Sequence, residues 1–275
     1  MNITTKGIIH LMAEKFDQDI STFSTNFLES AITNRMNFSS YKTLPDYLQK
    51  FSSDPFEPEM LMKSLSNSYS TFFRNSLTFA LLYQVILPKI ISEKASNNDS
   101  EIRIWSAGCA AGQEPYSLAI LIDDLFKIKP TELRHQIFAT DNSDSELLTA
   151  SVGIYDFDAV KPTPYSFIKK YFIKTGNFYS IRERIKAMVE FSHYDLLDTT
   201  SSAPPASIYG DFDLVMCSNV LFYYKPEIQK MILEKFRKTI RKGGFFITGE
   251  AETGIVNSAA GFKHFIPSAP LYIRI

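Results

Sequence analysis

Hydrophobic residues in the first 65 positions recur at the spacing of amphipathic helices. Three helical faces are predicted, and they consist of Ile8, Ile9, Leu11, Met12 and Phe16, then Phe23, Phe27, Leu28, Ala31 and Ile32, then Leu44, Tyr47, Leu48 and Phe51. Pro45 is placed for the first turn of the third helix. After a break at 52–58, further helices are expected at Glu59–Leu65 and Phe79–Ile91, with a solvated loop at Lys94–Ser100. An all-helical domain at 1–65 and a linker with a helix at 66–100 are predicted.

From Glu101 the pattern changes to short β-rich runs that alternate with helical periodicity. The expected strands are Ile102–Trp105, Gln136–Ala139, Met188–Ser192, Phe212–Met216, Phe245–Thr248, Gly261–Ile266 and Leu271–Ile275, and the expected helices are Pro115–Phe126, Ser143–Ser151 and Pro226–Ile240. Such alternation is typical of an α/β domain with a mostly parallel sheet and helices on both faces, here over 101–275. Prolines, aromatic residues and mixed charges between Tyr155 and Ile185 predict a small inserted subdomain at about 155–190.

Composition narrows the class of protein. The 275 residues carry 29 Lys and Arg against 30 Asp and Glu, so no nucleic-acid partner is indicated. No apolar run approaches the roughly 18 residues of a membrane span, and none has the pattern of a signal peptide. Two cysteines, Cys109 and Cys217, are too few for a disulfide framework or a zinc site. We therefore expect a cytoplasmic protein that is not inserted in a membrane and holds no metal.

The segment Ile102–Leu118, IRIWSAGCAAGQEPYSL, carries the clearest chemical signal. A strand, a small-residue turn with Gly108 and Gly112, and a helix follow one another, as at the nucleotide site of a doubly wound domain. Glycine lets the backbone approach the ligand there. Asp141 ends the second strand and is placed to accept hydrogen bonds from ribose hydroxyls, although capping of the next helix is an alternative. Its offset of 29 residues from Gly112 exceeds the roughly 20 of a nicotinamide fingerprint.

Polar residues also follow the third and fourth expected strands. Asp195 can accept from an adenine amino group while Leu196 packs on the ring, and an ordinary loop aspartate is an equal alternative. Asn219 lies at the switch point of such a sheet, where ligands bind. Of Tyr223 and Tyr224, one can face the pocket and the other belongs to the core, and periodicity does not choose between them.

These segments together resemble the CheR family, the S-adenosylmethionine-dependent protein-glutamate O-methyltransferases of chemotaxis receptors. The matching stretches are TFFR at 71–74, IWSAGCAAGQEPYSLA at 104–119, FATD at 138–141, SVGIYD at 151–156, FDLVMCSNVLFYY at 212–224 and RKGGFFITGEAE at 241–252. The resemblance implies a Rossmann-like class I methyltransferase fold with a seven-stranded, mostly parallel sheet. It also implies an N-terminal helical domain and a small antiparallel β subdomain insert.

The resemblance further implies the roles of single residues. Arg74 and Tyr223 face the transferred methyl group and form the expected catalytic pair. The expected cofactor-binding residues are Ser68, Ser70, Arg74, Gly108, Glu114, Asp141, Asp195, Leu196, Ser218 and Asn219, with Glu114 near the methionine end. S-adenosylhomocysteine is then the product. A glutamate side chain is already ionised at pH 7, so in-line placement matters more than a general base, and positioning can supply about 7–11 kcal/mol. Arg74 can hold the carboxylate bidentately.

Several positions depart from the family pattern. Ser218 stands where the family usually has arginine, and Gly249-Glu250-Ala251-Glu252 replaces its GHSE motif. Residues 1–63 hold six Lys and Arg against eight Asp and Glu, so electrostatic steering toward an acidic receptor helix is weak. The subdomain turn at 174–179 is short and has one glycine, whereas members that bind a receptor's C-terminal pentapeptide carry a longer turn with two. Independence from such a tether is therefore expected, and the protein is separately expected to be a monomer.

The leading hypothesis is a methyltransferase acting on glutamates of the chemoreceptor cytoplasmic domain. Three alternatives stay open. The first is a cofactor-binding signalling protein that has lost turnover, which Ser218 and Glu250 favour, and the second is a methyltransferase for a less acidic target. The third is a nicotinamide oxidoreductase, which the long offset between Gly112 and Asp141 disfavours.

Overall fold

The computed structural model describes residues 3–39, 41, 43–66, 69–97, 99–207 and 210–275. The chain forms two compact units. A helical unit comprises Met1–Ser68 together with Leu221–Lys230, and an α/β unit comprises Tyr69–Val220 and Met231–Ile275. The segment Leu221–Lys230, expected within the 101–275 domain, thus groups with the helical unit. No helix in the described part of the chain has the length and apolar character needed to cross a membrane.

The helical unit contains α1 (Ile3–Phe16), α2 (Thr25–Phe38), α3 (Leu44–Ser53) and α4 (Glu57–Leu65). Its core consists of the residues from the three predicted amphipathic faces and from α4, namely Ile8, Met12, Leu28, Ala31, Ile32, Tyr47, Phe51, Leu61 and Leu65 with Ile20 and Met36. The Thr43 side chain caps α3 by accepting from the Asp46 amide, and Pro45 occupies its first turn as predicted. Arg35 of α2 and Glu57 of α4 form a bidentate ion pair that joins the two helices.

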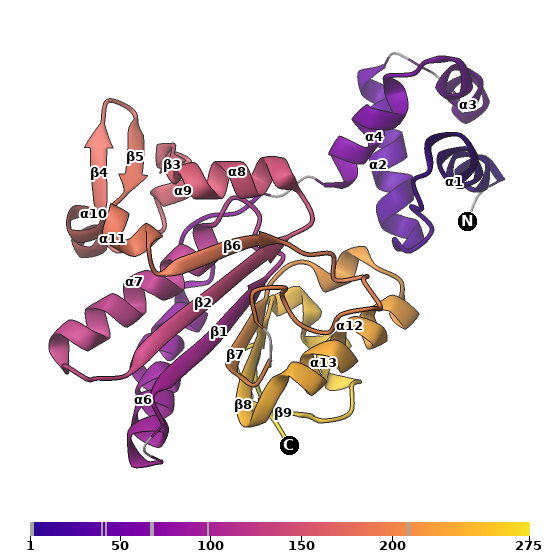
Figure 1. The fold of residues 1–275 in the computed structure, drawn as a ribbon. Helices are drawn as coiled ribbons and strands as arrows, with labels where there is room; N and C mark the ends of the chain where they lie inside the picture. Colours follow the sequence, from indigo (N-terminus) through magenta and orange to yellow (C-terminus); the bar gives the residue numbers. More distant parts are fainter. Residues whose placement is uncertain (1–2, 40, 42, 67–68, 98, 208–209) are drawn as a thin grey trace. The chain divides into compact units, whose positions relative to one another are not determined.

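The α/β unit is built on a seven-stranded sheet with the order β6-β2-β1-β7-β8-β10-β9 (Figure 1). Its strands are β1 (Glu101–Ala107), β2 (Arg134–Asp141), β6 (Val189–His193), β7 (Phe212–Cys217), β8 (Ile240–Thr248), β9 (Phe262–Ile266) and β10 (Leu271–Arg274). The first five pair in parallel, while β10 runs antiparallel to β8 and β9. The mostly parallel sheet with helices on both faces is confirmed, and all seven predicted strands are present.

Alternation along β1 distributes its side chains between the two faces of the sheet. Ile102 and Ile104 point toward the core shared with α5 (Ser76–Leu81), α6 (Leu87–Ser96) and α7 (Gln113–Ile128). Trp105 points to the opposite face, where it packs on Phe212 and on Phe236 of α12 (Pro226–Thr239). A π-helical segment, η1 (Leu82–Ile86), joins α5 to α6. The other helices around the sheet are α8 (Asp144–Val152), α13 (Thr253–Asn257) and two short 3₁₀ segments, η2 (Leu221–Tyr223) and η3 (Glu250–Glu252).

The expected solvated loop at Lys94–Ser100 is partly wrong. Helix α6 continues to Ser96, and the Lys94 side chain is buried because its ammonium pairs with Asp99 at 2.8 Å and with Asp213 at 3.2 Å. Charge in a sequence predicts exposure unless a partner lies elsewhere in the fold. Here one of the two partners, Asp213, is more than a hundred residues away in the sequence.

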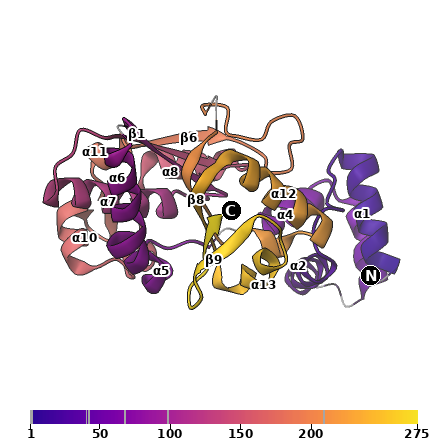
Figure 2. The same cartoon turned by 90° about the horizontal axis from the view of Figure 1, so that it is seen from below.

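The insert folds as an antiparallel sheet of order β3-β5-β4. Its elements are β3 (Ile154–Tyr155), α9 (Phe157–Val160), α10 (Tyr165–Tyr171), β4 (Phe172–Thr175), β5 (Phe178–Ile181) and α11 (Glu183–Lys186). Aromatic residues predicted for this region form its core together with Phe72. The centroid of the Phe72 ring lies 4.8 Å from that of Tyr155 and 5.0 Å from that of Phe172. Figure 2 shows the insert with α6 and α7 at one end of the α/β unit and α13 with β9 toward the other. The small antiparallel subdomain is confirmed.

Candidate functional site

The turn between β1 and α7 is shaped by three residues with positive φ, Gly108 (70°), Ala110 (48°) and Gly112 (89°). A Cβ on Gly108 would lie 2.7 Å from Val220, and one on Gly112 would lie 2.9 Å from Ala150. Glycine is therefore required at both places by close packing as well as by φ. The amides of Gly108 and Cys109 both donate to the Thr140 carbonyl, which ties the turn to the end of β2.

Asp141 binds the turn to the second strand. Its carboxylate accepts from the Ala110 amide at 2.8 Å and from the Ser143 amide at 3.0 Å. Helix α8 is capped by Ser143, whose hydroxyl accepts from Glu146, so the capping alternative for Asp141 does not apply. Burial raises the pKa of Asp141, while the backbone donors oppose that rise. Each carboxylate oxygen has a second lone pair, so Asp141 can hold the turn and still accept from a ligand.

Glu114 stands in the first turn of α7, where the helix dipole favours a negative charge. Its Oε1 accepts from the Ser106 hydroxyl at 2.7 Å. Burial raises the pKa of Glu114 to about 7, and the negative charge of Glu252 adds to the rise, while Ser106, Ser218 and the Arg74 guanidinium oppose it. Glu114 and Asp141 take part in no ion pair within the described ranges. Two carboxylates thus flank the glycine turn, and the hydrogen bonds that they accept from described residues come from neutral donors.

Arg74 follows two buried phenylalanines in a tight turn. Phe73 has a φ of 51°, and its amide donates to the Ser117 hydroxyl at 3.1 Å while that hydroxyl donates to the Gln113 carbonyl. Ser117 thus fastens the Arg74 turn to the first turn of α7, the turn that carries Glu114. The Arg74 guanidinium is exposed and donates to the Tyr69 carbonyl at 3.0 Å. It is close enough to Glu114 to act on its charge.

The loop after β7 carries Ser218 and Asn219 to the same edge of the sheet. Asn219 has a φ of 64°, and its amide donates to Glu252 Oε2 at 2.9 Å. Glu252 is fully buried and also accepts from the Gly249 amide and the Thr248 hydroxyl. The Ser218 hydroxyl oxygen is buried beside Glu114. Glu250 lies at the surface, where it accepts from the Asn75 amide group at 2.8 Å. In the sequence Glu252 is recognisable only as part of a motif, and its role in holding Asn219 was not predicted.

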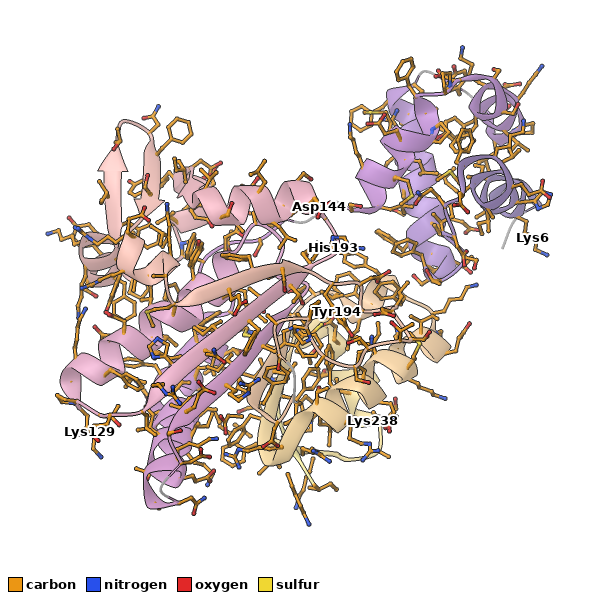
Figure 3. All side chains as sticks on the ribbon, viewed as in Figure 1. Lys6, Lys129, Asp144, His193, Tyr194 and Lys238 are labelled. Carbon is orange, nitrogen blue, oxygen red and sulfur yellow. The ribbon has the colours of Figure 1, made fainter. Side chains whose placement is uncertain are left out.

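The loop after β6 carries Asp195 and Leu196. Asp195 is partly buried and accepts from the Leu197 amide at 2.8 Å, while Leu196 is 6% exposed. The Tyr194 amide donates to the Asp141 carbonyl, so this loop starts beside the end of β2. Figure 3 labels Tyr194 here, next to His193, whose ring lies 3.0 Å from the Asp144 carboxylate. The α/β unit thus brings together Arg74, Glu114, Asp141 and the loops with Asp195, Ser218 and Asn219.

The remaining predicted residues lie elsewhere. Ser68 is outside the described residues, and Ser70 is partly buried in the segment before Arg74. Tyr223 and Tyr224 belong to the helical unit. There Tyr224 stacks on Phe23 and is 8% exposed, whereas Tyr223 packs on Phe27 at 4.6 Å and is partly exposed. This packing identifies Tyr224 as the core aromatic that periodicity could not distinguish, and a catalytic role for Tyr223 stays a prediction.

A separate basic cluster lies at the insert. Lys127, Lys170, Arg182 and Arg184 line a shallow pocket of about 470 Å³. Three of these cations form ion pairs: Lys127 and Arg184 with Asp123, and Lys170 with Asp124. The Tyr171 ring packs beneath Lys170. Most of this charge is therefore compensated within the protein, and the cluster serves to join α7 to α10 and α11.

The groups around the glycine turn fit S-adenosylmethionine, a cation that carries a sulfonium and an ammonium group. Two carboxylates that form no ion pair with any described residue can compensate that charge, and Asp141 keeps acceptor capacity for hydroxyl groups. The glycine turn allows close approach of the ligand to the backbone.

Comparison with known proteins agrees with this assignment. The family model described as CheR methyltransferase, SAM binding domain, matches residues 68–266. Chemotaxis protein methyltransferase 1 of Pseudomonas aeruginosa is 35% identical over 198 residues, which cover 70% of this chain and 69% of that protein. The chemotaxis protein methyltransferase of Borreliella burgdorferi is 28% identical over 249 residues, 90% of this chain and 86% of that protein.

A longer relative and a solved structure extend the comparison. An uncharacterised 104.1 kDa protein of Rhodobacter capsulatus is 29% identical over 245 residues, and the chain spans only 25% of its length. The structure of magnesium protoporphyrin IX methyltransferase from Synechocystis PCC 6803 with bound SAM aligns with 72% of this chain and 76% of its own, at 16% identity and a TM-score of 0.33.

Proposed function

Because the chain belongs to the CheR family of S-adenosylmethionine-dependent methyltransferases, we propose that it methylates glutamate side chains of a chemoreceptor's cytoplasmic domain. Relatives that align over most of the chain are chemotaxis protein methyltransferases, which supports a role in chemotaxis. Such a substrate implies a cytoplasmic location. The observation that carries the proposal most directly is the pair of carboxylates, Glu114 and Asp141, that flank the glycine turn without an ion-pair partner in the described structure.

The cofactor supplies a sulfonium methyl group that a weak nucleophile can attack. Glu114 holds the ammonium of the methionine end, and Asp141 accepts from the ribose hydroxyls. Asp195 and Leu196 receive the adenine, while Ser70, Gly108, Ser218 and Asn219 complete the pocket; Ser68, also expected there, lies outside the described residues. The raised pKa of Glu114 supports its part, because a carboxyl with a pKa of about 7 gains its charge when a cation binds beside it.

Arg74 orients the substrate. The attacking group is a glutamate carboxylate, which is already ionised at neutral pH, so no residue has to remove a proton from it. A guanidinium can hold that carboxylate in a bidentate geometry. In the structure the Arg74 guanidinium makes only one side-chain hydrogen bond within the described residues, to a backbone carbonyl, so it can turn to the substrate at little cost. Membership of the family supports a role for Tyr223 in steering the carboxylate.

Incubation with methyl-tritiated S-adenosylmethionine and host membranes tests the proposal. Label released by mild base as volatile methanol from a receptor-sized band establishes a carboxyl methyl ester. The second candidate function is a cofactor-binding signalling protein without turnover, which the Glu250 carboxylate favours by bonding to Asn75 next to Arg74. Binding of S-adenosylhomocysteine without base-labile label would favour this second function. Titration with receptor C-terminal pentapeptides and sedimentation analysis test the expected independence from a tether and the monomeric state.

Replacing Arg74 separates chemistry from binding. For Arg74→Ala we expect turnover to fall by about 10³-fold or more, since the loss removes the positioning of a weak nucleophile. The fold should survive because the side chain is exposed. The base-labile methanol assay, with circular dichroism as the check of folding, measures this effect. Arg134→Ala, an exposed arginine at the opposite end of β2, serves as the control. Turnover within tenfold of wild type in folded Arg74→Ala would contradict the assigned role.

A further inference from the structure

We propose that Lys235 of α12 is a positioning residue that sets the conformation of the Tyr194–Asp198 loop and thereby the affinity for the adenosyl end of the cofactor. The proposal deepens the function above and rests on the assignment of Asp195 and Leu196 to the adenine. It concerns a residue that contacts the loop backbone and has no part in the chemistry of methyl transfer.

The Lys235 ammonium uses its three protons on three acceptors of one loop. Its Nζ donates to the Leu196 carbonyl at 2.9 Å, to the Asp198 carbonyl at 2.6 Å and to the Tyr194 hydroxyl at 2.9 Å. An ammonium has three donors, so the group is fully used in this arrangement. The side chain is 7% exposed, which is unusual for lysine and indicates a specific partner.

The acceptors flank the two residues assigned to the adenine. One carbonyl belongs to Leu196 itself, and the other belongs to Asp198, whose amide donates back to the Asp195 carbonyl at 3.0 Å. The Asp195 side chain closes a turn on the Leu197 amide. The Lys235 ammonium therefore anchors the chain directly at Leu196 and on the far side of Asp195.

The Tyr194 ring completes the anchor. Its amide donates to Asp141, its hydroxyl donates to the Ser201 carbonyl at 2.8 Å, and the Lys235 ammonium lies 4.9 Å from the ring centroid. Trp105 of β1 packs against the same ring with 5.8 Å between centroids. The loop is thus held between the end of β2, the far face of β1 and α12, and Lys235 is the polar contact from the helix.

Charge balance explains why lysine serves at this place. Burial lowers the pKa of Lys235, and the carboxylates of Asp198 and Asp195 oppose that fall. The carbonyl groups would be left without a donor if the ammonium were removed, and a buried acceptor without a donor favours rearrangement of its loop. A neutral side chain of similar length would fill the space and leave those acceptors unsatisfied.

The Lys235→Met variant tests the proposal, with Lys238→Met as the matched control. Lys238 is exposed on the same helix, three residues on, and contacts no part of the loop in the described structure (Figure 3). Binding of S-adenosylhomocysteine and of 5′-methylthioadenosine is measured by calorimetry. We expect Lys235→Met to weaken both ligands by a similar factor, about 10- to 100-fold (about 1.4–2.8 kcal/mol), because buried acceptors left without a donor loosen the loop. Lys238→Met should bind both like wild type.

A second measurement reports on the loop without any ligand. Hydrogen exchange at the Leu197 and Asp198 amides should rise in Lys235→Met while exchange in β1 stays unchanged. Tyr194→Phe removes one of the three acceptors, so ligand affinity should fall and loop exchange should rise by a smaller factor, about two- to fivefold. This variant keeps the test available if Lys235→Met does not fold. Methyl transfer at saturating cofactor should be unchanged in both variants.

The outcomes separate the two proposals. One outcome is that the wild type binds S-adenosylhomocysteine and folded Lys235→Met matches it in affinity and in hydrogen exchange of the loop. This result overturns the role of Lys235 and leaves the proposed function intact. A loss confined to S-adenosylhomocysteine, with 5′-methylthioadenosine unaffected, also overturns it, because the effect would then lie at the methionine end. No binding of either ligand by the wild type overturns the proposed function itself.

Discussion

Buried or partly buried carboxylates lie at both ends of the parallel sheet, and the groups that compensate their charge differ. At the amino end, Asp213 of β7 is fully buried and pairs with Lys94 and Arg241, while its second oxygen accepts from the Arg103 amide. At the carboxyl end, Glu114 and Asp141 accept hydrogen bonds from hydroxyl and amide donors and, within the described ranges, from no cation.

One end has its carboxylate paired with cations of the protein, and the other end has carboxylates that receive hydrogen bonds from neutral donors among the described residues. A buried charge costs free energy unless a cation or several donors compensate it. Asp213 obtains that compensation from the protein, so the amino end is complete in itself. The carboxyl end keeps a surplus of negative charge, and the raised pKa of Glu114 records its cost. Under the proposed function, a cationic cofactor completes this end of the sheet.

Breaking the compensated end should have the largest effect on stability. Asp213→Ala leaves Lys94 and Arg241 buried with one acidic partner each, Asp99 and Glu93. We expect a loss of about 3–5 kcal/mol in the free energy of unfolding. Urea denaturation measures it. Glu101→Gln removes one ion pair among the described residues, that with Arg103 at the same end of the sheet, and should cost no more than about 1 kcal/mol. Equal losses in the two variants would contradict the comparison.

Breaking the loop at the carboxyl end should have an intermediate effect. Glu252→Gln exchanges the buried acceptor of Asn219, Gly249 and Thr248 for an amide, and we expect about 1–3 kcal/mol of destabilisation. Weaker binding of S-adenosylhomocysteine should accompany it because Asn219 loses its anchor. Denaturation and calorimetry measure the two effects. Glu250→Gln, an exposed neighbour in the same motif, is the control and should leave both quantities near wild type.

Neutralising Glu114 tests the comparison between the two ends, because its effect on the stability of the apoprotein should depend on pH. The pKa of this carboxyl in the folded protein, about 7, lies above its ordinary value of 4.5. The folded state therefore binds more protons than the unfolded state between these values, and stability contributed by the protonated form is lost as pH rises toward and through 7. Glu114→Gln should stabilise the apoprotein at pH 8 by about 1–3 kcal/mol and have little effect at pH 4.

The same variant should lose the pH dependence of cofactor binding. In the wild type, affinity for S-adenosylhomocysteine should fall about tenfold from pH 8 to pH 6, because protonated Glu114 cannot compensate an ammonium group. Glu114→Gln should bind weakly at both pH values. Thermal unfolding and calorimetry at pH 4, 6 and 8 test both statements. A destabilised Glu114→Gln apoprotein at pH 8 would contradict the idea of a surplus charge held for a ligand.

Local patterns in the sequence predicted much of the fold. The seven strands, helices α7, α8 and α12, and the antiparallel insert were all anticipated, because alternation and glycine turns are local signals. The family was also recognised correctly from short motifs. The Lys94 assignment failed because its partner Asp213 is distant in the sequence. Lys235 and Ser117 were missed for the same reason: their acceptors and donors lie on other elements.

The sequence by itself determined the elements, the family and the residue types that can bind a cationic nucleotide, since periodicity and glycine spacing act over a few residues. Only the tertiary structure decided how these residues are held. In the folded protein Ser143, and not Asp141, caps α8, and Tyr224 is buried against Phe23. The Glu252 carboxylate accepts a hydrogen bond from the Asn219 amide. Each of these depends on hydrogen bonds and packing between segments far apart in the chain, and burial, which sets the charge of Glu114, exists only once those segments meet.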